Sequence, residues 1–156
     1  MDYSFKEKST WISFVSTLLI FGYYFIQLVQ LDGLPPPEAK QAANVLLLKT
    51  IVLSIVVEAL FHGMLAATNH KAAAMGADER DQLFELKANN MGYWVLGGCV
   101  VICIFHLLLS DNISGYEVSD SVTSTPYLSA HILIFGFILS ELVRFGVRIF
   151  YYRRGI

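Results

Sequence analysis

The chain has 156 residues, of which 55% are hydrophobic and 15% are charged, and its formal net charge is −2. A soluble domain carries about 25% charged residues, so this composition excludes an ordinary soluble domain and indicates an integral membrane protein. The small net charge gives no global basic field for direct nucleic-acid binding, and the length leaves room for one domain, residues 1–156.

The first apolar run predicts a membrane-spanning helix over about residues 10–31. A cleaved secretory signal would have a shorter apolar core, of about 7–15 residues, followed by small residues at the cleavage site. Here the run is followed by Leu34-Pro35-Pro36-Pro37, a sequence that ends a helix and forms a turn. We therefore expect this first helix to be retained.

The second helix is expected over about residues 39–69, and it carries Glu58 and His62 within an apolar run. Because an α-helix rises about 1.5 Å per residue, this helix is longer than the ~30 Å hydrocarbon core requires, so it must tilt or protrude. A linker of small residues, 72–77, follows it.

The third helix is expected over about residues 78–109, and its first part is charged. Asp78 is predicted to cap it, with Asp81 three residues later in a partial capping box. The charged stretch runs without a helix breaker into the apolar run that starts at Met91. One helix should therefore begin in water and continue into lipid, where Gly97-Gly98 predicts a close contact with another helix.

A polar loop over residues 110–126 separates the third helix from the fourth, which is expected over about residues 127–152. The loop contains acidic residues but no lysine or arginine. The fourth helix carries Glu141 and Arg144, and the chain then ends in an aromatic and basic tail.

The positions of the lysines and arginines predict the orientation of these helices, because basic residues in short loops favour the cytoplasmic side. They gather before the first helix, between the second and third helices, and after the fourth, whereas the other two loops together hold only Lys40. We therefore expect an all-α bundle of four transmembrane helices with both termini, and the start of the third helix, in the cytoplasm.

Two pairs of ionisable residues fall inside predicted spans: Glu58 with His62, four residues apart, and Glu141 with Arg144, three apart. Each pair shares a helix face, and both are expected in the inner half of the membrane. We predict that they form one buried polar cluster. The cluster would serve as a clamp between helices, as such polar groups more often do, or as the proton or ion relay of a small transporter. A metal site is a weaker alternative, since a closed site needs about four ligands.

His106 and His131 lie towards the opposite side of the membrane, on the third and fourth helices. Two facing histidines could hold a haem between them, which would make the protein a redox protein. The alternative is two interfacial histidines, which is favoured because nothing else in the sequence requires haem. We accordingly predict no cofactor and no metal.

The charged start of the third helix has two interpretations. It is either a solvated extension whose charges keep it out of lipid, or a docking surface for a cytoplasmic partner with apolar anchors among charges. The docking residues would be Asp78, Glu79, Arg80, Asp81, Leu83, Phe84, Glu85 and Lys87. The sequence holds no Ser-His-Asp array, phosphate-binding glycine loop or CxxC pair, so no enzyme is predicted and no catalytic residue is assigned.

Five short segments form a recognisable pattern: Asp78-Glu79-Arg80-Asp81, Glu85-Leu86-Lys87-Ala88-Asn89, Gly92-Tyr93, Glu141-Leu142-Val143-Arg144 and Tyr152-Arg153-Arg154-Gly155. With these segments the chain resembles a family of uncharacterised bacterial and archaeal four-helix membrane proteins of about this size. The resemblance implies a multi-pass protein of the inner membrane and brings no biochemical activity. Because genes of that family often neighbour small helix-turn-helix regulators, it also implies a DNA-binding regulator protein as partner.

The leading hypothesis from the sequence is thus a non-enzymatic regulatory protein of the bacterial or archaeal inner membrane. It would contact the lipid bilayer and present the start of the third helix to the regulator. A homo-oligomer is also expected, because a single four-helix unit of this size can bury few polar groups alone.

Overall fold

The computed structural model describes residues 4–68, 70, 78–112 and 128–154. In these residues the chain forms long helices and no strand, which confirms the all-α prediction. The elements are α1 (Phe5–Val29), the 3-10 helix η1 (Gln30–Gly33), α2 (Pro36–Thr68), α4 (Glu79–Asn112) and α6 (Leu128–Arg154). The predicted linker 72–77 and most of the predicted acidic loop, residues 113–126, lie outside the described residues.

Three of the described helices are long and apolar enough to cross a membrane: Phe5–Val29, Pro37–Thr68 and Glu79–Leu109. Their outward surfaces agree with this, because large apolar side chains on α2 such as Leu48, Ile55 and Leu60 are mostly exposed in the single chain. Apolar surface of this extent needs lipid or a partner to cover it. The chain is therefore a helical membrane protein.

The helix ends follow local capping chemistry. The predicted start of the first helix at residue 10 is wrong, because the hydroxyl of Ser4 accepts a hydrogen bond from the backbone N–H of Glu7 at 3.1 Å and starts α1 at Phe5. Pro36 begins α2, a position where the fixed φ of proline suits the first helical turn. Asp78 lies directly before α4, where its carboxylate accepts from the N–H of Glu79 at 2.7 Å and its carbonyl oxygen accepts from the N–H of Gln82 at 3.0 Å; the predicted capping bond to the second or third helical residue is not seen.

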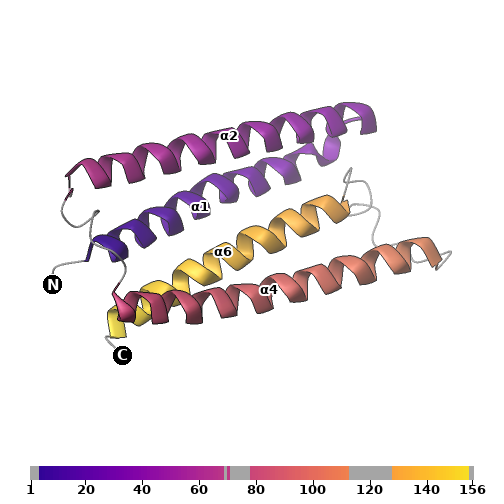
Figure 1. The fold of residues 1–156 in the computed structure, drawn as a ribbon. Helices are drawn as coiled ribbons and strands as arrows, with labels where there is room; N and C mark the ends of the chain where they lie inside the picture. Colours follow the sequence, from indigo (N-terminus) through magenta and orange to yellow (C-terminus); the bar gives the residue numbers. More distant parts are fainter. Residues whose placement is uncertain (1–3, 69, 71–77, 113–127, 155–156) are drawn as a thin grey trace.

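The helices of this bundle are arranged as a row in the order α2, α1, α6, α4 (Figure 1). α1 packs against α2 on one side and against α6 on the other, and the most extensive packing is between α4 and α6. The four helices run side by side, and the start of α1 and the end of α6 lie at the same end of their long axes (Figure 1). This end of the helix axes is called the end of the row where both termini lie. α2 and α4 are thus the outer members, and α1 separates α2 from α6.

The close packing of α4 on α6 depends on two glycines. A Cβ added at Gly136 would overlap the Cβ of Cys99, and one added at Gly92 would lie 3.1 Å from the carbonyl oxygen of Ser140. The predicted close contact at Gly97-Gly98 is wrong, because an added Cβ there meets nothing within 4 Å. Those two glycines lie on the side of α4 that α6 does not cover.

Replacing Gly136 by alanine should weaken the α4–α6 contact, because the added methyl group overlaps the Cβ of Cys99 and forces the two backbones apart. Overpacking of this kind costs about 1–3 kcal/mol. The expected result is a lower thermal midpoint of the purified protein in detergent. Gly97→Ala is the matched control and should leave the midpoint unchanged or raise it slightly; equal effects of the two substitutions would contradict the packing described here.

Candidate functional site

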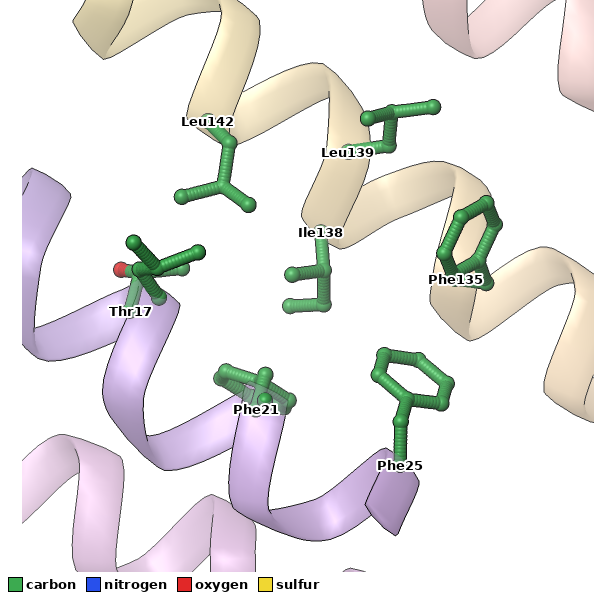
Figure 2. A pocket seen from close by; sticks show the side chains of 9 residues that line it. Thr17, Phe21, Phe25, Phe135, Ile138, Leu139 and Leu142 are labelled. Atoms are coloured by element: carbon green, nitrogen blue, oxygen red, sulfur yellow. The ribbon is translucent and has the colours of Figure 1, made fainter. Parts of the chain in front are cut away.

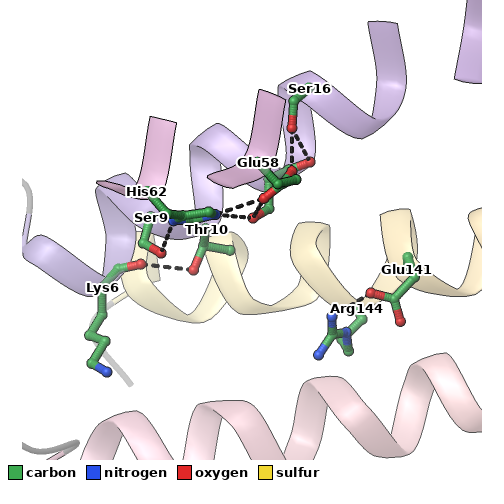
Figure 3. Close-up of polar contacts among 9 residues, drawn as sticks. Lys6, Ser9, Thr10, Ser16, Glu58, His62, Glu141 and Arg144 are labelled. Carbon is green, nitrogen blue, oxygen red and sulfur yellow. Dashed lines mark hydrogen bonds and ion pairs between the residues drawn. The ribbon is translucent and has the colours of Figure 1, made fainter. Parts of the chain in front are cut away.

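The most extensive polar network in the described residues lies between α1 and α2 (Figure 3). On α2, His62 Nε2 lies 2.7 Å from Oε2 of Glu58, one helical turn away. On α1, the hydroxyl of Ser13 donates to the same carboxylate oxygen at 3.0 Å, and the hydroxyl of Ser16 donates to the other oxygen. Ser9 closes the network with its hydroxyl 3.2 Å from His62 Nδ1.

This network, formed by Ser9, Ser13, Ser16, Glu58 and His62, is referred to below as the serine–carboxylate network. Its three serines are spaced i, i+4 and i+7, so they lie on one face of α1 and extend along about 10 Å of its axis. A serine hydroxyl both donates and accepts, and an imidazole can exchange a proton at either nitrogen. The arrangement can therefore hold a proton on the carboxylate or the imidazole and move it between them.

Sequence reasoning found Glu58 and His62 but missed the serines. The available signal was the repeat of small hydroxyl residues at helical spacing in an otherwise apolar run. Serines also pack well between helices without any chemical role, so the repeat becomes informative only once α1 is placed beside α2.

The second predicted pair, Glu141 and Arg144, forms its own ion pair on α6 (Figure 3). The prediction of one cluster of four residues is wrong, because α1 lies between α2 and α6 and keeps the two pairs apart. Arg144 instead lies on the α4 side of α6, where its Cβ would be 3.4 Å from a Cβ added at Gly92. Its guanidinium also lies 4.8 Å from the ring centroid of Phe145.

The charged start of α4 is packed against the end of α6. The ring of Phe84 is fully buried, stacked on Tyr151 with centroids 5.5 Å apart and edge-on to Tyr152 at 5.3 Å. The hydroxyl of Tyr152 donates to Asp81 at 2.7 Å, and Arg148 lies 3.8 Å from the carboxylate of Glu85. The prediction that Phe84 anchors a partner protein is therefore wrong, since its ring is already covered within the chain.

The remaining predicted docking residues form a smaller exposed face. Leu83 and Leu86 are 46% and 68% exposed. Asp78, Glu79, Arg80 and Lys87 are also exposed, although the cationic groups of Arg80 and Lys87 lie over the rings of Phe84 and Tyr151 at the edge of the α6 contact. The structure thus divides the predicted docking stretch into one side that packs on α6 and one side that is open.

An ion pair also joins the first turn of α1 to the last turn of α6. Arg153 Nε lies 3.1 Å from Oε1 of Glu7, a carboxylate that is mostly buried. This contact holds the two chain ends together at the same end of the row.

His106 and His131, the two histidines considered as alternative haem ligands, are not brought face to face. His131 on α6 is buried, and its Nδ1 lies 2.9 Å from the hydroxyl of Tyr24 on α1. His106 lies on α4, on the other side of α6 from α1. In the described part of the chain, no group of three or more His, Cys, Asp or Glu side chains is placed to hold a metal ion.

An apolar cavity of about 190 Å³ lies along the contact of α1 with α6 (Figure 2). Phe21 and Phe25 face Phe135 and Ile138 across it, and Thr17 is its one hydroxyl residue. The lining offers almost no polar group to fix a ligand, so the cavity carries no chemistry comparable to the serine–carboxylate network.

Comparison of the chain with known proteins found no matching family model, no similar curated protein and no similar solved structure.

Replacing Phe84 by alanine should destabilise the protein strongly, because it removes a fully buried ring that stacks on Tyr151 and meets Tyr152 edge-on. The expected loss is about 3–5 kcal/mol, measured as a lower thermal midpoint in detergent. Leu86→Ala, two residues away and largely exposed, is the control and should change the midpoint little. If the two variants were equally stable, the α4 start would not be held on α6 as described.

Proposed function

We propose that this chain is a small proton-linked membrane transporter and not an enzyme. The observation that carries the proposal is the hydrogen-bonded Glu58–His62 pair, which lies in an apolar helix long enough to span a membrane and is held by serine hydroxyls of the neighbouring helix. Ionisable groups inside a span are costly and mark proton or ion pathways. In this function the serine–carboxylate network takes up and releases a proton.

The membrane arrangement that we propose has four spans, with α6 as the fourth. Both termini and the start of α4 are on the cytoplasmic side of a bacterial or archaeal inner membrane. Support comes from the basic residues Lys6, Lys8, Arg153 and Arg154, which belong to the end of the row where both termini lie (Figure 1). Such a concentration of positive charge favours the cytoplasmic side.

We also propose a homo-oligomer for the working transporter. Its support is the exposure of the network in the single chain, where 31% of the Glu58 side chain and 36% of the His62 side chain are accessible. Contact of these groups with lipid is unfavourable. A second copy packed along α2 would cover their exposed side.

Glu58→Gln should abolish proton flux into proteoliposomes that contain the purified protein. Glutamine keeps the size of the side chain and much of its hydrogen bonding but cannot take up a proton in this way. We expect at least a tenfold lower flux, followed with a pH-sensitive dye after an imposed potential. Glu141→Gln, which alters the separate ion pair on α6, should retain flux; wild-type flux in Glu58→Gln would refute the proposed site.

A second candidate function is the docking of a small helix-turn-helix transcription regulator on the open side of the α4 start. The observation that favours it is the exposure of Leu83 and Leu86 among exposed charged residues, an apolar pair of the kind that anchors a partner helix. The residues proposed for docking are now Asp78, Glu79, Arg80, Leu83, Leu86 and Lys87.

Reversing both charges, with Glu79→Arg and Arg80→Glu, should release a DNA-binding regulator that co-purifies with the wild type from native membranes in mild detergent. Partners would be identified by mass spectrometry. The control variant reverses the charges of Glu38 and Lys40 at the start of α2. These two residues lie at the opposite end of that helix from the serine–carboxylate network. A regulator that is retained equally by both double variants would rule out docking on this face.

A further inference from the structure

A long groove runs along α1 beside α2, and the last turn of α6 lines one end of it. Its apolar part, about 380 Å³, is lined by Val15 and Leu19 of α1 and by Val57 and Phe61 of α2. A second part, of about 590 Å³, is lined by Lys8, Leu65 and Arg153. Trp11 and Ile12 line both parts, so the two parts adjoin each other along α1.

We propose that this groove binds one anionic phospholipid from the membrane leaflet at the end of the row where both termini lie. The acyl chain would occupy the apolar part, and the headgroup phosphate would lie between Lys8 and Arg153. The proposal uses the membrane orientation given above and does not depend on proton exchange by Glu58 and His62.

The length of the groove matches one leaflet. From Lys8 to Leu19 the α1 axis advances about 16 Å, which is close to half of the ~30 Å hydrocarbon core. Lys8 and Arg153 line the groove at the end nearest the termini, whereas towards the middle of the helix its lining is almost entirely apolar, with Ser16 as its hydroxyl residue. A phospholipid has the same order of chemistry along its length, with its charge at the surface and its chains at the centre.

The charges favour a lipid with a net negative headgroup. Lys8 is exposed, and 44% of the Arg153 side chain is accessible although it pairs with Glu7. The described residues that line the second part of the groove include these two cations and no acidic residue. Trp11 lies at the junction of the two parts, where an indole ring commonly marks the level of the lipid headgroups.

Occupancy of the groove would also affect the neighbouring polar network. Ser16 lines the apolar part of the groove, and its hydroxyl donates to Glu58. An acyl chain in the groove would therefore cover the Ser16 side of the serine–carboxylate network and exclude water from it.

The chain has two tryptophans, so Trp11 can be made the sole emitter by Trp94→Phe. In nanodiscs, its fluorescence would be titrated with brominated phosphatidylglycerol and with brominated phosphatidylcholine of the same acyl chains. We expect Trp11 to be quenched at about fivefold lower mole fraction of the anionic lipid, the size of effect that one cationic side chain contributes at an anionic surface. The reverse reporter, Trp11→Phe with the exposed Trp94, should show no preference.

Charge variants test the headgroup contact. Lys8→Gln and Arg153→Gln should each remove most of the preference seen by Trp11, whereas Arg154→Gln, the same charge change on the adjacent residue, should retain it. Circular dichroism and size-exclusion profiles would confirm that each variant is folded. Equal quenching by the two lipids, equal loss in Arg154→Gln, or protection of Trp11 from both lipids by a second copy in the groove would each overturn the proposal. None of these readouts depends on proton flux.

Discussion

The need to pair polar groups inside an apolar environment governs the position of α1. In lipid, no water satisfies a buried hydroxyl or carboxylate, so each must find a partner on a neighbouring helix. α1 meets this need on two sides: Ser13 and Ser16 bond Glu58 of α2, and Tyr24 bonds His131 of α6. These specific contacts fix which helices flank α1 and in which register. The apolar surface alone would permit many arrangements of the same helices.

The pair formed by α4 and α6 is held by a different principle, which is shape. Gly92 and Gly136 remove side-chain bulk where the backbones approach, and the rings of Phe84 and Tyr151 stack where the helices leave the apolar run. A cation–π contact adds to this packing: the ammonium group of Lys87 lies 4.8 Å from the ring centroid of Tyr151. Close packing of this kind is rigid and leaves little room for substitution. The pair therefore provides a firm platform beside the polar contacts of α1.

The sequence was sufficient for features that depend on neighbouring residues along one helix. The four helices and the Glu58–His62 and Glu141–Arg144 pairs all follow from local spacing. What it could not predict is which helix lies beside which. Periodicity places Glu58 and Glu141 on helix faces but does not reveal that α1 separates them. For the same reason Phe84 looked available to a partner, although it is covered by residues that lie almost seventy positions later in the chain.

The row arrangement has a mechanical consequence. Among the described residues, the α1–α2 pair is joined to the α4–α6 pair mainly through the single contact line of α1 with α6. Any displacement of one pair relative to the other must therefore disturb this line, where the Tyr24–His131 hydrogen bond, the Arg153–Glu7 ion pair and the apolar cavity all lie.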